Sequence, residues 1–229
     1  MYIGDYLGRR AIYSPDKLAV VDAGKQPELR LTYAQMNARA NRLAHWLRTE
    51  AGIGQGDRVA ILARDGVEHL DTFFACGKLG AIHTALNWRL HWRELAEIMA
   101  NTTPKVLIYS DEFSAAVAHL QNDEQAASLT HFVHVEGAGV PGSVLFAAAS
   151  GAETAVTTPT LSEEDIAALI FTGGTTGLPK AAQVTHRMIA WNTLNTVIHD
   201  LQHNDVYLNV FPLFHTGGLF VYTLPQIIL

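Results

Sequence analysis

The sequence contains a single cysteine, Cys76, among its 229 residues. One thiol cannot close an internal disulfide, so the chain lacks the framework of a small disulfide-stabilised secreted domain. Its eleven histidines include no H-E-x-x-H motif, and with no cysteine cluster the sequence offers no standard zinc site. Cys76 lies in the apolar run HLDTFFACGKLGAI, where we expect a buried, unreactive thiol.

Charge is also scarce, because charged residues make up only 17% of the chain and its lysines and arginines form no basic tract. The net charge of −6 has the wrong sign for a broad nucleic-acid footprint, so we expect no nucleic-acid partner. No apolar stretch approaches the roughly 18 residues that a membrane helix needs, so we expect no membrane span. The opening MYIGDYLGRRAIYSP lacks a secretory signal. These absences predict a cytoplasmic protein.

Apolar material is plentiful, at 48% of the chain, and suffices for one large domain or two small ones. Apolar runs such as DRVAILA, KVLIYS and HFVHV alternate with segments of helical periodicity such as VEHLDTFFACGKLG and HWRELAEIMANT. Strands that alternate with helices are typical of βαβ units. We therefore predict an α/β fold with mostly parallel sheets and flanking helices.

The amino-acid composition of the sequence changes after Val135. Residues 136–165 are rich in Gly, Ala, Thr and Pro, and we interpret them as a connecting seam. This divides the chain into a first α/β subdomain over residues 1–135 and the start of a second over residues 166–229, where IAALIF and DVYLNVF predict strands. Because the last residues, FVYTLPQIIL, are apolar to the end, we expect the chain to be a piece of a longer protein.

The stretch FTGGTTGLPK, residues 171–180, follows the predicted strand IAALIF. Its glycines remove side chains, so that backbone N–H groups can turn toward a ligand, and its threonines add hydroxyl donors. Its lysine adds a positive charge suited to phosphate. A flexible connector is the alternative, but donors at nearly every position favour a polyphosphate-binding loop. The candidate ligand residues are Thr172, Gly173, Gly174, Thr175, Thr176, Gly177 and Lys180.

Other nucleotide and hydrolase motifs fit less well. In a P-loop, Gly-Lys-Ser/Thr follows a four-residue spacer, whereas here two residues separate Gly177 from Lys180 and Ala181 follows. GAGVPG, residues 137–142, matches the dinucleotide pattern G-x-G-x-x-G, which leaves an oxidoreductase as a rival hypothesis. We interpret it as a surface loop, because no convincing helix follows. No G-x-S-x-G elbow is present.

His215 stands apart from the other histidines. It lies in FPLFHTGGL, a glycine-bearing turn after the predicted strand DVYLNVF. A packed turn histidine is one interpretation. The other is a residue at the mouth of a pocket, because open α/β sheets bind ligands at the carboxyl ends of their strands.

The segment IFTGGTTGLPKAAQVTH resembles the phosphate-binding signature of the adenylate-forming enzymes, which include acyl-CoA synthetases, firefly luciferases and adenylation domains. FPLFHTGGL resembles the next landmark of that superfamily, and GDRVAILARDGVEHLDTFFACGKLGAI resembles its first βαβ unit. The resemblance covers nearly the whole chain. Two positions depart from the usual pattern, because Gly173 stands where the family has Ser and Ala181 where it has Gly.

The resemblance implies a two-step reaction. A small-molecule carboxylate attacks the α-phosphate of ATP to give an acyl-adenylate, and a thiol, usually that of coenzyme A, then takes the acyl group. The loop would hold the β- and γ-phosphates with the help of Mg2+, and His215 would gate or line the acyl pocket. Positioning and charge neutralisation are what such phosphate sites chiefly supply.

The family's adenine segment, magnesium-binding glutamate, ribose-binding aspartate and catalytic lysine all lie further downstream. The resemblance therefore implies an N-terminal fragment of an ATP-dependent carboxylate–CoA ligase, with a fatty acyl substrate as first candidate and no catalytic residue of its own. We expect the fragment to be inactive without its own missing C-terminal portion. The alternative is a stand-alone nucleotide- or acyl-binding module without ligase activity.

Overall fold

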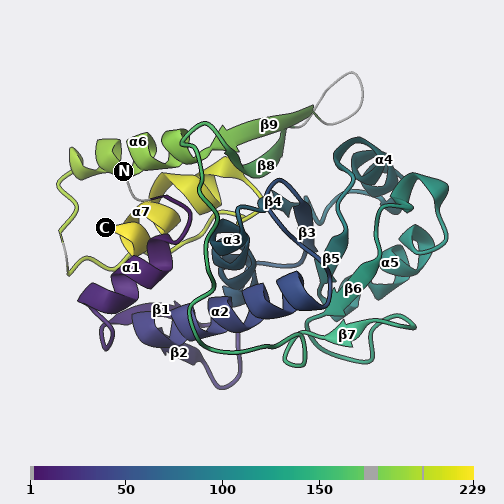
Figure 1. The fold of residues 1–229 in the computed structure, drawn as a ribbon, viewed down its shortest axis with the longest axis horizontal. Coiled ribbons are helices and arrows are strands. Elements are labelled where there is room, and N and C mark those ends of the chain that lie inside the picture. Colours follow the sequence, from purple (N-terminus) through teal and green to yellow (C-terminus); the bar gives the residue numbers. More distant parts are fainter. Residues whose placement is uncertain (1–2, 173–179, 203) are drawn as a thin grey trace.

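The computed structural model describes residues 3–172, 180–202 and 204–229. Within these residues a seven-stranded sheet forms the centre (Figure 1). In spatial order its strands are β7 (Val144–Leu145), β6 (His131–His134), β5 (Val106–Tyr109), β3 (Arg58–Leu62), β4 (Ile82–Ala85), β8 (Ile166–Thr172) and β9 (Lys180–Thr185). Neighbouring strands are parallel except β8 and β9, which are antiparallel. The predicted α/β fold with a mostly parallel sheet is confirmed.

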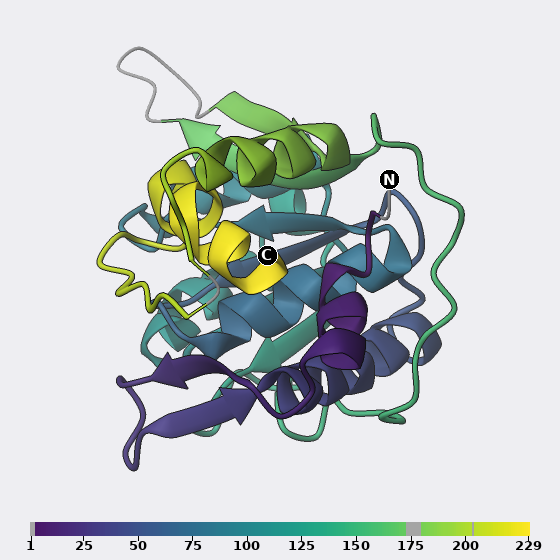
Figure 2. The ribbon, with the colours of Figure 1, turned by 90° about the vertical axis from the view of Figure 1, so that its left-hand side faces the viewer.

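Helices cover both faces of this sheet (Figures 1 and 2). One face packs against α1 (Tyr6–Tyr13), α2 (Tyr33–Thr49) and α3 (Val67–Leu79), and against the C-terminal segment with α6 (His186–Val197), a π-helical turn (Gly217–Thr223) and α7 (Leu224–Ile228). The other face packs against α4 (Trp92–Thr102) and α5 (Ser114–Leu120). Short 3-10 turns lie at Asp111–Phe113 and Glu124–Ala126, and β1 (Leu18–Asp22) pairs with β2 (Leu29–Thr32) in a separate antiparallel ribbon.

Strand β3 shows why the central strands carry apolar runs: after Arg58, all its residues are apolar. Its Val59 and Ile61 belong to the core under α2 and α3, whereas Ala60 and Leu62 belong to the core under α4 and α5. Successive side chains of a strand point to opposite faces, so a sheet covered on both faces requires apolar residues without alternation. The near-continuous apolar runs in the sequence therefore have a direct structural cause.

Residues 146–165 cross the outside of the molecule as an extended segment beside α2 (Figure 2). Side chains of α2 donate to its backbone carbonyls: Asn41 Nδ2 lies 2.7 Å from the oxygen of Glu153, and Arg48 Nη2 lies 2.7 Å from the oxygen of Thr157. Beyond this segment, β8 joins the same sheet by pairing with β4. The division of the chain at residues 135 and 166 stays a prediction, and one continuous sheet spans both parts.

The prediction of a strand over DVYLNVF is wrong for the chain as it stands. Residues 205–211, which carry this pattern, form no strand. A strand exists only when its backbone groups pair with a neighbour. No described residue provides such a neighbour here, so the segment is unpaired despite its apolar alternation.

A buried ion pair fixes α1 against α3. Lys78 is almost completely buried, and its Nζ lies 2.5 Å from Asp5 Oδ1 and 2.7 Å from Asn37 Oδ1. Burial lowers the pKa of the Lys78 ammonium, and the Asp5 carboxylate opposes this effect. The same carboxylate caps α1 by accepting from the backbone N–H of Gly8 at 2.9 Å. Asp5 thus satisfies both a buried cation and a helix terminus.

We expect the substitution Asp5→Ala to lower the free energy of unfolding by about 3–5 kcal/mol, because it leaves the Lys78 ammonium buried without a counter-charge. Urea denaturation monitored by circular dichroism measures this loss. The control is Asp16→Ala, which removes an exposed carboxylate near the same helix and is expected to change the free energy by less than about 0.5 kcal/mol. Equal effects of the two substitutions would contradict the anchoring role.

His83 on β4 is completely buried, and neither ring nitrogen has a hydrogen-bond partner among the described residues. Its ring lies 5.6 Å from Phe73 and 6.4 Å from His69. Burial, assisted by the neighbouring His69, lowers the pKa of His83 to about 3. The imidazole is therefore neutral in the folded protein well below the pH at which a free histidine takes up a proton.

This difference predicts sensitivity to acid. The unfolded chain binds a proton at His83 below about pH 6.5, whereas the folded chain does not, so the free energy of unfolding falls as the pH drops below this value. Between pH 7 and pH 5 the variant His83→Leu should lose about 2 kcal/mol less than the unsubstituted chain. Urea denaturation at both pH values measures the difference, and identical pH dependence in the two proteins would refute it.

Candidate functional site

The carboxyl ends of β3, β4 and β8 form one edge of the sheet. These three strands are adjacent and parallel, so their last residues, Leu62, Ala85 and Thr172, lead into loops on the same side. Open α/β sheets bind ligands outside the carboxyl ends of their strands, where loops and unpaired backbone groups meet. The candidate phosphate loop begins at this edge, since Thr172 is the last residue of β8.

The two ends of the candidate loop are held together. Thr172 and Lys180 are register partners in the antiparallel pair of β8 and β9, and Thr172 Oγ1 donates to the backbone oxygen of Lys180 at 3.3 Å. Both residues are exposed, so the hydroxyl and the ammonium are open to a ligand. After the loop, β9 returns antiparallel to β8. Gly173, Gly174, Thr175, Thr176 and Gly177 lie outside the described residues, and their part in the site stays a prediction.

His215 lies in an exposed turn and accepts hydrogen bonds from residues that follow it closely in the sequence. Its Nδ1 accepts from the N–H of Gly217 at 3.1 Å, and its backbone oxygen accepts from Gly218 and Leu219 at 3.1 Å each. The turn is tight, because a Cβ at Gly218 would lie 2.1 Å from the backbone oxygen of Pro212. The histidine therefore begins the π-helical turn with its imidazole at the surface.

Two residues that the sequence analysis did not select hold this turn over the sheet edge. Asp65, which follows β3, accepts from the N–H of Leu213 through Oδ1 at 2.7 Å. Trp88, which follows β4, packs edge-on against Phe214 with a ring separation of 6.2 Å. Because β3 and β4 end at the same edge as β8, these contacts bring His215 to the edge that carries Thr172. The sequence offered one signal for Asp65, its position shortly after the predicted strand DRVAILA.

The same edge carries two further cations. The guanidinium of Arg64 lies 3.8 Å from the centre of the Trp88 ring, and that of Arg89 lies 4.7 Å from it. Arg64 also forms an ion pair with Glu112 at 3.1 Å. Stacking on an aromatic face orients a guanidinium without neutralising it. Because Glu112 balances the charge of Arg64, Arg89 and Lys180 are the groups that could attract an anionic ligand to this edge.

The rival dinucleotide motif lacks the structure that it would need. Gly137, Gly139 and Gly142 all have positive φ, and the turn leads into the two-residue strand β7 with no helix after it. A pyrophosphate site of that type depends on the N-terminus of a following helix. The interpretation of GAGVPG as a surface loop is confirmed. Cys76 is buried as expected, and burial raises the pKa of its thiol.

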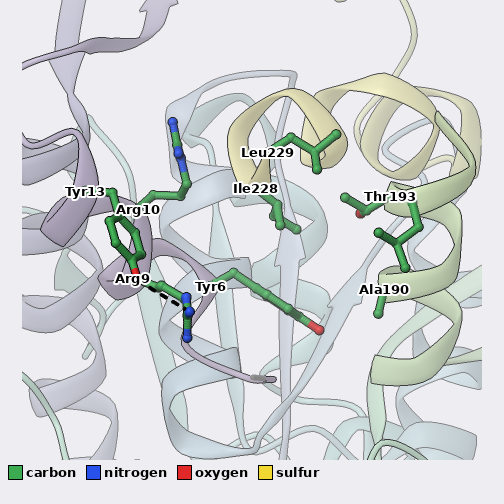
Figure 3. A pocket seen from close by; sticks show the side chains of 9 residues that line it. Tyr6, Arg9, Arg10, Tyr13, Ala190, Thr193, Ile228 and Leu229 are labelled. Carbon is green, nitrogen blue, oxygen red and sulfur yellow. Dashed lines mark hydrogen bonds between the residues drawn. The ribbon is translucent and has the colours of Figure 1, made fainter. Parts of the chain in front are cut away.

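A cavity of about 410 Å³ lies elsewhere, between α1, α6 and α7 (Figure 3). Tyr6 and Arg10 of α1 line it opposite Thr193 of α6 and Leu229 at the end of α7. None of these elements borders the carboxyl edge of the sheet, so the cavity is separate from the candidate site. Across the described ranges, no group of three or more histidine, cysteine or acidic side chains could hold a metal ion, and no helix is both long and apolar enough to cross a membrane.

Residues 7–228 match the model of the AMP-binding enzyme family, which covers nearly the whole chain. The chain belongs to the AMP-binding enzyme family. A feruloyl-CoA synthase of Amycolatopsis sp is 34% identical over 230 residues, which cover 99% of this chain and 42% of that protein. A long-chain-fatty-acid–CoA ligase of Mycobacterium tuberculosis is 34% identical over 221 residues, 95% of this chain and 42% of that protein.

Solved structures of this family share the fold. The N-terminal domain of a fatty acyl-CoA ligase from Mycobacterium tuberculosis superposes with a TM-score of 0.84 at 29% identity, over 98% of this chain and 54% of that one. ATP-bound MatB from Rhodopseudomonas palustris superposes with a TM-score of 0.81 at 28% identity, over 99% of this chain and 44% of that one. The expected superfamily is thus confirmed, and the chain spans about 42% of the length of these curated relatives.

We expect the substitution Asp65→Ala to release the turn that carries His215, because it removes the hydrogen bond from the N–H of Leu213 to a carboxylate. Such bonds contribute about 1.5–3 kcal/mol, so the amide of Leu213 should exchange with deuterium roughly tenfold faster or more. Hydrogen exchange followed by NMR measures this rate. Amides of the β3–β4 pair serve as internal controls and should exchange as before. An unchanged rate at Leu213 would exclude the tether.

Proposed function

We propose that this chain is the N-terminal portion of an ATP-dependent carboxylate–CoA ligase, which forms an acyl-adenylate and then an acyl thioester. The observation that carries the proposal is the meeting, at one sheet edge, of the Thr172–Lys180 loop ends with the turn of His215. The family match and the CoA ligases among the relatives support it. A long-chain fatty acid is the first candidate substrate, in line with one of these relatives, while a feruloyl-CoA synthase represents aryl acids.

In this proposal the loop from Thr172 to Lys180 holds the β- and γ-phosphates of ATP. The Thr172 hydroxyl supplies a donor by exchanging its bond to the backbone oxygen of Lys180 for one to phosphate, and the Lys180 ammonium neutralises charge on the phosphates. Gly173, Gly174, Thr175, Thr176 and Gly177 complete the loop. Mg2+ would bind through the phosphates, since Mg2+ in nucleotide sites is held mostly by substrate oxygens and water, and the described residues offer no carboxylate cage.

His215 belongs to the wall of the acyl site in this proposal. Its imidazole is exposed at the sheet edge, and the contacts from Asp65 and Trp88 fix its turn there. We assign no catalytic residue to this chain, and we expect the carboxylate and coenzyme A steps to need the remaining C-terminal portion of the ligase. A cytoplasmic location also stays a prediction.

The substitution Lys180→Ala tests the role of the loop. Loss of a charge-assisted contact to phosphate should weaken ATP binding roughly tenfold or more, as measured by isothermal titration calorimetry. The matched control is Lys105→Ala, because Lys105 directly precedes β5 and so lies at the opposite, amino edge of the sheet. Its removal should leave ATP affinity unchanged. Absence of ATP binding to the unsubstituted chain, or equal affinity of the Lys180→Ala variant, would contradict the proposed loop function.

The purified chain also allows a test of the expected lack of ligase activity. We expect no carboxylate-dependent exchange of pyrophosphate into ATP, since the groups that complete the site are not in this chain. Isotope exchange with decanoate and with ferulate measures the activity. Exchange by the purified chain alone would overturn this expectation. ATP binding without any ligation even after the C-terminal portion is supplied would instead favour the alternative of a nucleotide-binding module.

A further inference from the structure

The antiparallel ribbon of β1 and β2 reaches the start of α3 through one side chain. Asp22 is the last residue of β1, and its Oδ2 accepts a hydrogen bond from the backbone N–H of Val67 at 3.0 Å. The other oxygen, Oδ1, accepts from the N–H of Gly24 at 3.0 Å, which orients the carboxylate within the ribbon. The ribbon lies at the outside of the molecule (Figures 1 and 2), and this contact joins it to a helix of the core over 45 residues of sequence.

Helix α3 depends on this contact because its own N-cap is a glycine. Gly66 has no side chain that could cap the helix, so the first backbone N–H groups need an acceptor from elsewhere. Asp22 supplies that acceptor, and its negative charge is also favourable at the positive end of the helix dipole. Gly66 leaves room for the approach, since a Cβ there would lie 3.4 Å from Asp22 Oδ2 and 2.9 Å from Glu68 Oε2.

A second contact joins the same two elements. Lys25, in the turn between β1 and β2, forms an ion pair with Glu68 in the first turn of α3, and its Nζ lies 2.9 Å from Oε1. Only 13% of the Glu68 side chain is exposed, so water screens this pair less than a fully exposed one. The ribbon thus holds the first turn of α3 at two neighbouring residues, Val67 and Glu68.

The first turn of α3 bounds the loop that reaches the candidate site. Only residues 63–66 separate the end of β3 from α3, and β3 is fixed within the sheet. The loop contains Asp65, which accepts from the N–H of Leu213, and Arg64, which stacks on Trp88. A segment this short between two fixed ends has few conformations, so the placement of its α3 end decides where Asp65 lies.

We propose that Asp22 is a positioning residue for the candidate site. By capping α3 it sets the loop of residues 63–66, and through Asp65 it holds the turn of His215 at the sheet edge. Asp22 itself bonds to Gly24 and Val67, so it acts on the turn only through the loop. This inference rests on the proposed function, which makes the turn of His215 part of the wall of the acyl site. It adds that the ribbon keeps this wall in place.

Hydrogen exchange of the purified chain, followed by NMR, tests the positioning role. Asp22→Ala removes both acceptors, so the amide of Leu213 should exchange roughly threefold faster or more. Asp22→Asn keeps one acceptor and should give a smaller acceleration, which provides the test if the alanine variant does not fold. The matched control is Glu28→Ala, because Glu28 is an exposed carboxylate of the same ribbon that pairs with Arg30 of β2. It should leave the Leu213 rate unchanged.

Two comparisons separate positioning from a general loss of stability. Amides of the β3–β4 pair should exchange as in the unsubstituted chain. In the Asp65→Ala background the link to Leu213 is already broken, so Asp22→Ala should change the Leu213 rate by less than about twofold.

The proposal is wrong if Asp22→Ala accelerates exchange in the first turn of α3 but not at Leu213, because the carboxylate is then only a helix cap. It is also wrong if the β3–β4 amides accelerate equally, or if the substitutions at Asp22 and Asp65 act additively. A chain that shows the expected Leu213 rates but does not bind ATP would leave the positioning role intact and refute the proposed ligase function, so the two failures are distinguishable.

Discussion

The requirement that the central sheet be buried on both faces governs the rest of the structure. Parallel strands cannot be joined by tight turns, and β3, β4 and β5 are each followed by a helix that returns the chain along one face. In β3 this leaves no polar side chain after Arg58, since Val59 and Ile61 meet α2 and α3 while Ala60 and Leu62 meet α4 and α5. Polar and charged groups are therefore displaced to the ends of the strands.

This displacement explains why the candidate site gathers at one edge. Asp65, Trp88 and Thr172 come from three different strands, and they approach one another only because the strands are parallel and adjacent. The antiparallel β9 closes the sheet beside them and brings Lys180 back to the same edge. Polar groups that are buried need compensation: Lys78 is paired with Asp5, and His83 remains neutral.

Much of this architecture was predictable from local sequence patterns. The apolar runs gave the strand positions, and the capping residues Thr32 and Thr185 marked the starts of α2 and α6, where each accepts a hydrogen bond from the backbone N–H three residues on. These features depend on residues close together in the sequence. The role of Asp65 was not predictable, because its partner Leu213 lies 148 residues away and an aspartate after a strand resembles any surface carboxylate.

The strand expected over DVYLNVF failed for a related reason. Its alternation identifies apolar side chains that burial would stabilise, but strand pairing depends on a neighbouring backbone that the local sequence does not contain. The candidate site was predictable only in part: Thr172, Lys180 and His215 were selected from sequence motifs. Their arrangement at a shared edge, and the Arg64–Trp88–Arg89 stack beside them, required the three-dimensional structure.

The extended segment over α2 has a consequence for how the two partners can change during evolution. Its carbonyl oxygens accept the hydrogen bonds, so almost any amino acid can occupy Glu153 or Thr157 without loss of these bonds. The donors on α2 have no such freedom, because positions 41 and 48 need side chains that carry an N–H donor and are long enough to reach these carbonyl oxygens. Substitutions should therefore accumulate in the segment, whereas the residues of α2 that face the segment should change less.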